Sequence, residues 1–123
     1  MRCVLFLVPV GLGLVLGEVM ALEAPGRGRE LARRVRIILR DHCFSCHGQD
    51  PENIEGDGLN ILDRGMLIER HLVVPKKPAE SRMMRKIEMG TMPPPGEGTS
   101  VPADQIKVLR AWIDAGAAPF ADD

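Results

Sequence analysis

The feature that most constrains this chain is the motif Cys-x-x-Cys-His at residues 43–47. Cys43 and Cys46 lie three positions apart, and His47 follows directly. The stretch around them, DHCFSCHGQD, offers little that could pack a core. Thiols and an imidazole are reactive and ligating groups. The fold therefore has to be built around whatever these three side chains hold.

Cys-x-x-Cys-His is the attachment signature of c-type haem. Two thiols three positions apart, near the end of a helical turn, can both reach the vinyl groups at the edge of one porphyrin and form thioether bonds there. The next residue then lies under the ring and binds the iron from the proximal side. The motif predicts a covalently attached haem on Cys43 and Cys46, with His47 as an iron ligand.

Three other uses of this motif remain open. A thiol–disulfide redox motif has the same cysteine spacing, but it usually belongs to a βαβ unit, and no strand pattern precedes Cys43. A zinc site could combine the motif with His42 or His71, but the second pair of ligands that zinc usually takes is missing. A structural disulfide across two intervening residues would be strained.

The opposite face of a six-coordinate iron takes a Met or a His. Met92 is the expected ligand, because it lies in GTMPPPG, where three prolines hold the chain stiff. It follows His47 by 45 positions, which is enough chain to pass around the edge of a porphyrin. His71 is the alternative ligand, and Met92 could also lie in a surface loop without binding iron.

The remaining histidine and methionines are not expected to bind iron. His42 adjoins Cys43 and is poorly placed to reach the opposite face of the iron. Methionine is a flexible filler of hydrophobic cores. Packing is the expected role of Met66, Met83, Met84 and Met89.

Residues 1–21 have the layout of a secretory signal peptide. Arg2 precedes an apolar run from Cys3 to Leu16, shorter than the roughly 20 residues of a membrane-spanning helix. Val19-Met20-Ala21 suits cleavage after Ala21. Such a segment predicts a periplasmic or secreted protein, which agrees with haem attachment outside the cytoplasm. If the segment stays uncleaved, it associates the chain with a membrane.

Without that segment, about 100 residues remain, enough for one small domain. Its only aromatic residues are Phe44, Trp112 and Phe120. So small a domain, so poor in large rings, often depends on a cofactor for its interior. The net charge of −1 argues against a nucleic-acid partner. Residues 27–40 carry six arginines against one glutamate, a run that is usually solvated surface but could steer a redox partner.

Hydrophobic periodicity predicts an all-α domain without strands. The predicted helices span residues 28–42, 64–70, 78–90 and 101–116. Pro78 and Pro102 suit first turns, whereas Gly90 and Gly116 suit helix ends. Residues 22–28 are predicted to be a flexible lead-in.

Five motifs, taken in order, resemble the planctomycete-type cytochrome c domain, a member of the class I cytochrome c superfamily. They are DHCFSCHG, GLNILDRGML, VPKKPAESRMMRKI, GTMPPPG and LRAWIDAGA. Their order is much more specific than Cys-x-x-Cys-His alone. The resemblance covers residues 29–118, and family members often have a glycine where this chain has Lys76-Lys77.

The resemblance implies a cytochrome c domain over residues 29–120 with a helical fold around a covalent haem. It implies that the first and last helices cross near the haem, with Trp112 packed beside the porphyrin. The implied haem-binding residues are Cys43 and Cys46 for attachment, His47 as proximal ligand and Met92 as distal ligand.

The predicted function is one-electron transfer through a six-coordinate haem, with redox proteins as donor and acceptor. No acid–base pair or nucleophile is evident, so the protein is predicted to be a carrier and not an enzyme. If Met92 does not bind, a five-coordinate haem could bind small gases or reduce peroxide. A non-haem module that uses the thiols for metal or structure is the third hypothesis.

Overall fold

The computed structural model describes residues 25–50, 52 and 57–121, and within these ranges it is helical with no strand. The elements are α1 (Pro25–His42), α2 (Arg64–Glu69), the 3-10 turn η1 (Pro78–Glu80), α3 (Arg82–Glu88) and α4 (Ala103–Asp114). The all-α prediction is confirmed. The predicted signal peptide lies outside the described residues.

Helix α1 is longer than the sequence pattern predicts. It begins at Pro25, so residues 25–28 are helical although a flexible lead-in was predicted over 22–28. A proline at the first position of a helix explains the earlier start, because its fixed φ is already helical and its missing N–H has no partner there anyway. Its apolar face is buried and includes Val35, Ile38 and Leu39.

The predicted helix over residues 78–90 is in fact two elements. Ser81 interrupts it with an extended backbone (φ −76°, ψ 115°) between η1 and α3. Its fully buried hydroxyl donates to the Lys77 carbonyl at 2.9 Å and accepts from the Val74 N–H at 2.9 Å. A serine side chain that bonds nearby backbone competes with helix continuation. The helix ends as predicted, since α3 stops at Glu88 and Gly90 takes a positive φ of 66°.

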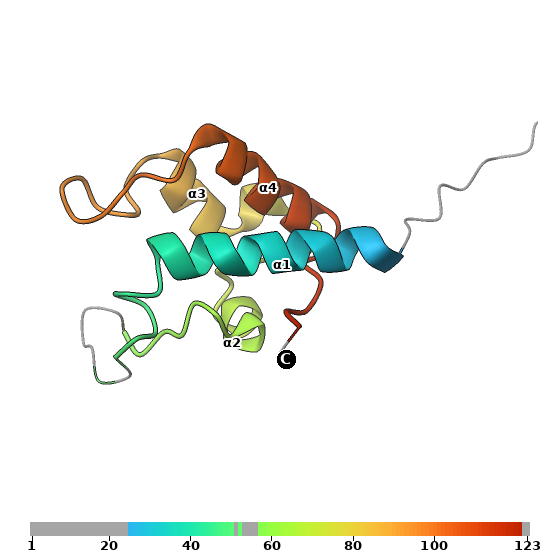
Figure 1. Ribbon diagram of the computed structural model, residues 1–123, viewed down its shortest axis with the longest axis horizontal. Coiled ribbons are helices and arrows are strands. Elements are labelled where there is room, and N and C mark those ends of the chain that lie inside the picture. Colours follow the sequence, from blue (N-terminus) through green and yellow to red (C-terminus); the bar gives the residue numbers. More distant parts are fainter. Residues whose placement is uncertain (1–24, 51, 53–56, 122–123) are drawn as a thin grey trace, which may run out of the picture.

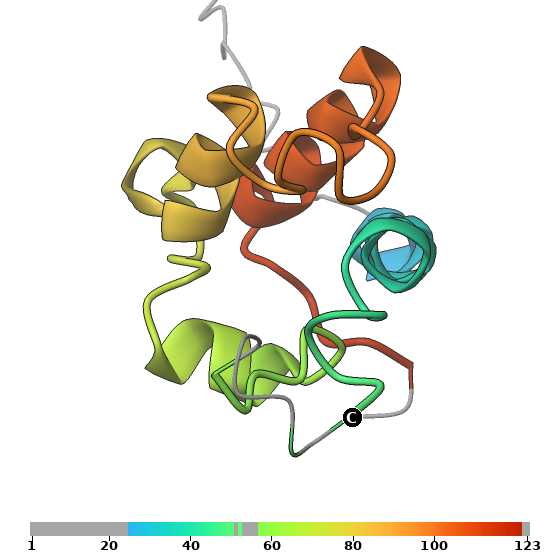
Figure 2. The same cartoon turned by 90° about the vertical axis from the view of Figure 1, so that its left-hand side faces the viewer.

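The core lies chiefly between α1 and α4, the two helices that pack most extensively against each other. They cross in Figure 1, and Figure 2 shows α3 beside α4 and α2 on the opposite side of the molecule. Leu39 of α1 and Leu109 and Ile113 of α4 are completely buried. The predicted crossing of the first and last helices is therefore present.

Trp112 lies at the contact between α4 and the C-terminal segment. Its ring is fully buried and stacks on Phe120, with centroids 5.4 Å apart, and its indole N–H donates to the Ala118 carbonyl at 2.9 Å. It thus closes the C-terminal segment over α4. It is not among the residues that line the cavity described below, and its packing beside a porphyrin stays a prediction.

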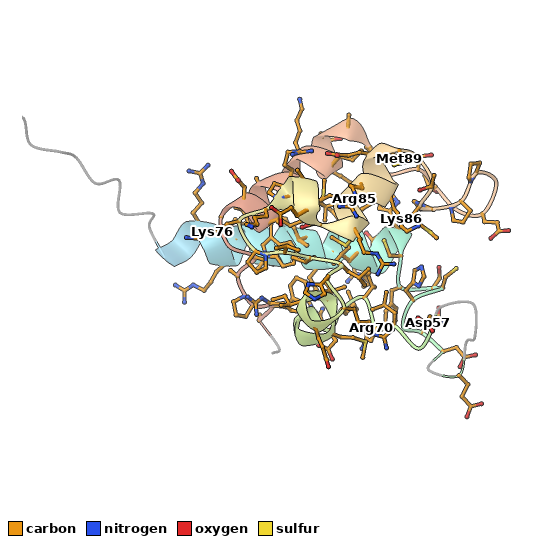
Figure 3. All side chains as sticks on the ribbon, turned by 180° about the vertical axis from the view of Figure 1, so that it is seen from behind. Asp57, Arg70, Lys76, Arg85, Lys86 and Met89 are labelled. Carbon is orange, nitrogen blue, oxygen red and sulfur yellow. The ribbon has the colours of Figure 1, made fainter. Side chains whose placement is uncertain are left out.

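Helix α2 forms where the sequence predicts a short helical turn. The Asp63 carboxylate caps it by accepting from the Met66 N–H at 2.9 Å. Arg70, directly after α2, donates to the Asp57 carbonyl at 2.9 Å and lies 3.7 Å from its carboxylate (Figure 3). These bonds hold the chain just before Leu59 and Ile61 against the rest of the domain. Of the helices in the described ranges, none has the length and apolar character needed to cross a bilayer.

Replacing Ser81 by alanine should lower the free energy of unfolding by about 1–3 kcal/mol. The substitution leaves the Val74 N–H without its partner in a half-buried position. Denaturant unfolding of the two proteins measures the difference. The exposed Ser100 provides the matched control, and a Ser100→Ala change should be nearly neutral. Equal effects of the two substitutions would contradict the proposed role of the Ser81 hydroxyl.

Candidate functional site

The Cys-x-x-Cys-His motif forms one helical turn directly after α1. The Cys43 N–H donates to the Leu39 carbonyl at 2.9 Å, and the His47 N–H donates to the Cys43 carbonyl at 2.9 Å. Residues four apart in such a turn lie on the same side. Cys43 and His47 accordingly face the same cavity, as the sequence spacing predicted.

Gly48 lets the chain leave this turn. Its φ is +147°, and a Cβ at this position would lie 2.6 Å from the Phe44 ring. No larger residue fits there without moving that ring. The chain after His47 is then held from the other side, because the Ile61 N–H donates to the His47 carbonyl at 2.7 Å.

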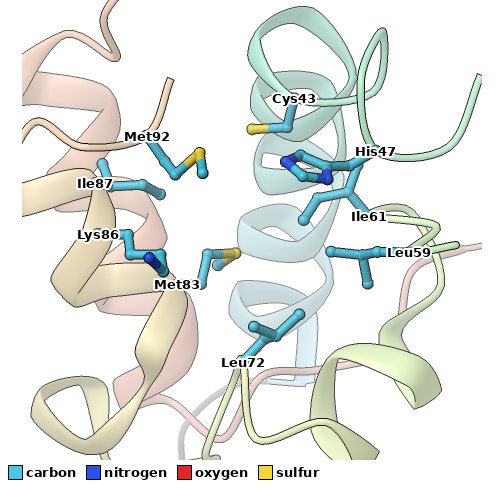
Figure 4. Close-up of a pocket in the computed structure, with 9 residues that line it drawn as sticks. All are labelled: Cys43, His47, Leu59, Ile61, Leu72, Met83, Lys86, Ile87 and Met92. Atoms are coloured by element: carbon cyan, nitrogen blue, oxygen red, sulfur yellow. The ribbon is translucent and has the colours of Figure 1, made fainter. Parts of the chain in front are cut away.

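The cavity beside the motif contains about 610 Å³ of space without protein atoms, part of it open to solvent. Its walls are almost entirely apolar. The lining residues are Cys43, His47, Leu59, Ile61, Leu72, Met83, Lys86, Ile87 and Met92 (Figure 4).

His47 and Met92 approach this cavity from opposite walls. Figure 4 shows the imidazole and the thioether pointing toward one another, with the Cys43 sulfur at the same end of the cavity. Nδ1 of His47 is buried and has no hydrogen-bond partner in the described part of the chain. A buried imidazole nitrogen without a partner is costly unless something else occupies the site. The donor set, two thiols, an imidazole and a thioether, fits a covalently held haem.

The two cysteines have different surroundings. Cys43 is half-buried, and burial together with the neighbouring Cys46 raises its pKa to about 11. Cys46 is exposed and lines a second hollow on the surface next to the cavity. The two sulfurs are not joined as a disulfide. The cavity and the surface hollow are adjacent, because Cys43, His47 and Met92 line both.

The loop that carries Met92 starts at the end of α3. The Thr91 N–H and the Met92 N–H both donate to the Lys86 carbonyl, at 3.0 and 3.2 Å. Lys86 also lines the cavity, although most of its side chain is exposed near Arg85 and Met89 (Figure 3). No helix forms over residues 91–100, as the prolines predicted.

The other predicted candidates lie elsewhere. His71, the alternative distal ligand, is exposed and does not line the cavity. The structure therefore does not place it opposite His47. Met89 is 73% exposed, and a packing role was the wrong expectation for it. Within the described residues no three His, Cys, Asp or Glu side chains gather to hold a metal ion, so the zinc alternative gains no support.

Sequence reasoning missed part of the cavity wall. Met83 was expected only to fill the core, but it is a second methionine that lines the cavity. Leu59 and Ile61 come from the segment between the motif and α2, where no helix was predicted. Their alternation with polar neighbours was a weak signal, because a loop residue faces a cavity only through the fold that surrounds it.

Residues 43–96 match the family model described as planctomycete cytochrome C. Over these residues the chain is similar to that family. The match runs from Cys43 through the proline-rich loop, so it includes both walls of the cavity, whereas α1 and α4 lie outside it. No curated protein and no solved structure matches the chain. The match confirms the resemblance inferred from the motifs. A cytochrome c domain generally implies covalent haem c.

The haem-free cytochrome domain should alkylate faster at Cys46 than at Cys43. Near pH 7 the raised pKa keeps Cys43 protonated, and a thiol is much less reactive than a thiolate. The alkylation rate of Cys43 should therefore rise steeply only as the pH approaches about 11. Mass mapping of iodoacetamide-treated protein over a pH series measures both rates. Because the native state retains this proton more strongly, the same shift should lower stability as the pH rises from about 9 to 11.

Protein unfolded in urea is the control, since both cysteines should then react alike. Equal reactivity of the two cysteines without urea would contradict the burial of Cys43.

Proposed function

We propose that this c-type cytochrome transfers single electrons through a six-coordinate haem. The observation that carries the proposal is the placement of His47 and Met92 on opposite walls of one apolar cavity that Cys43 also lines. When bound, haem supplies an iron that alternates between the ferrous and ferric states. The residues around it determine whether that iron only passes electrons or also binds other ligands.

Cys43 and Cys46 are the proposed attachment residues. Each S–H would add across one vinyl group, with the sulfur bonding to one carbon and the proton going to the other. The helical turn after α1 supports this role, because it presents Cys43 to the cavity and Cys46 to the adjoining hollow. Two covalent bonds on one turn would hold the cofactor against the end of α1.

His47 and Met92 are the proposed iron ligands. The imidazole would bind through one ring nitrogen, and the thioether through its sulfur. Methionine ligation raises the reduction potential of a haem. The apolar lining acts in the same direction, because a site with little solvent disfavours the more highly charged ferric form.

We also propose an extracytoplasmic location and protein redox partners. Cytochrome c domains generally function outside the cytoplasm, and the apolar sequence of residues 1–21 agrees with export. A six-coordinate iron has no open site for substrate, so its reactions would be with other redox proteins. If Met92 does not bind, the alternative is a five-coordinate haem that binds gases or reduces peroxide.

Replacing Cys43 and Cys46 together by serine should abolish covalent attachment. Protein matured with haem-attachment machinery should show the added mass of one haem, and the double variant should lack it. Acidified organic solvent should extract any haem from the variant but none from the parent protein. Haem retained by the double variant, or bare thiols in the parent, would refute the assignment.

Replacing Met92 by leucine should remove the distal ligand while preserving apolar volume. The weak red absorption band of sulfur–iron bonding should disappear from the ferric protein. The potential should fall by on the order of 0.1 V, within the range of about 0.8 V that axial ligands control. Spectra recorded during a redox titration measure both, and the parent protein should titrate as a one-electron couple.

Met83→Leu is the matched control, since it makes the same change in the same cavity. Its band and potential should stay close to those of the parent protein. Loss of the band in this variant alone would make Met83 the ligand. A high-spin ferric parent without the band would favour the five-coordinate alternative.

A further inference from the structure

The loop that carries Met92 has few attachments to the rest of the domain. At its start, Thr91 and Met92 bond to the Lys86 carbonyl. The Glu97 N–H donates to the Pro94 carbonyl at 3.0 Å, inside the loop. The chain returns to the core at the buried Val101. Among the hydrogen bonds of the described residues, a single one joins the stretch between Met92 and Val101 to another element, and it comes from His42.

His42 occupies the junction between the motif and the loop. It is the last residue of α1 and directly precedes Cys43. Its Nδ1 lies 3.0 Å from the Thr99 carbonyl oxygen, and its Nε2 lies 2.8 Å from Oε1 of Gln105 on α4. The imidazole thus links the end of α1 to two other parts of the domain, the Met92 loop and α4.

The chemistry of the two partners suits a histidine. A carbonyl oxygen only accepts, so Nδ1 of His42 donates to Thr99. The Gln105 amide can turn either its oxygen or its NH₂ group toward Nε2. It therefore complements that nitrogen whether or not it carries a proton. The ring is held from both sides in either state.

The hydrogen bond from His42 to Thr99 crosses the hollow beside Cys46. One wall comes from the motif and the end of α1, and the other comes from the loop, including Met92, Pro93 and Thr99. It contains about 600 Å³ of space without protein atoms, much of it open to solvent. His42 lines it and bridges the two walls, so the separation between the motif and the loop depends on this side chain.

We propose that His42 is a positioning residue that holds the Met92 loop closed over the haem site through its hydrogen bond to Thr99. This inference rests on the proposed ligation by Met92. Without the bond, the loop retains its attachment to Lys86 but swings more freely beyond Pro93. The distal methionine then leaves the iron more often, and an external ligand takes its place more quickly.

The test measures how fast imidazole displaces Met92 in the ferric, haem-loaded full chain. At saturating imidazole the limiting rate reports how often the loop opens. His42→Ala removes both hydrogen bonds and should raise this rate roughly three- to tenfold, the effect expected for one or two hydrogen bonds. His42→Gln, whose amide nitrogen replaces Nε2, loses the Thr99 bond and should behave like His42→Ala.

His42→Asn supplies the conservative rescue. Its amide nitrogen lies where Nδ1 lies in histidine, so it retains a donor toward the Thr99 carbonyl and should keep the limiting rate near that of the parent. A general loss of structure would not distinguish Asn from Gln. His71→Asn is the matched control at an exposed histidine that does not line either space, and it should change nothing.

The outcomes separate this proposal from the assigned function. If the parent shows the sulfur–iron band and all His42 variants open at the parent rate, the positioning role is wrong and the ligand assignment stands. If His42→Asn opens as fast as His42→Ala, the Thr99 bond is not the holding contact and the proposal is overturned. If the parent lacks the band, Met92 is not the ligand and both proposals fall.

Discussion

The packing of α1 against α4 is the interaction on which the rest of this structure depends. Leu39 of α1 and Leu109 and Ile113 of α4 are completely buried. The Cys-x-x-Cys-His turn continues directly from α1, so the position of this helix determines where Cys43 and His47 lie. Hydrophobic burial between the terminal helices thereby places one wall of the haem site. The family match does not include these helices, although they support the residues that it does include.

The second wall of the cavity consists of α3 and the Met92 loop, and hydrogen bonds hold it in place. Ser81 breaks the helical segment, and α3 then presents Met83 and Lys86 to the cavity before the prolines begin. Hydrogen bonds to the Lys86 carbonyl fix the start of the Met92 loop, and His42 holds its far side. The first wall follows packed helices, whereas the Met92 loop of the second wall is held at two points. Under the proposed ligation, the bond from Met92 would therefore be the one more easily lost.

Much of the fold was predictable because its signals are local. The apolar spacing of α1 and α4 follows helical periodicity, and the prolines of residues 93–95 exclude regular structure. The two wrong helix boundaries also had local causes. Pro25 allowed α1 to start early, and the side chain of Ser81 competed for backbone partners in a segment whose composition favoured one helix. Hydrophobic periodicity contains no information about either effect.

The sequence by itself determined which reactive groups this protein has: two thiols, an imidazole and a thioether that precedes three prolines, all at fixed spacings. It did so because the proposed covalent attachment and iron ligation require particular atoms, and the residue types alone specify those atoms. Only the tertiary structure decided which side chains share the cavity, that Trp112 packs away from it, and that His42 reaches Thr99 and Gln105. Contacts between residues so distant in the chain depend on how the helices pack, and that packing is a property of the whole domain.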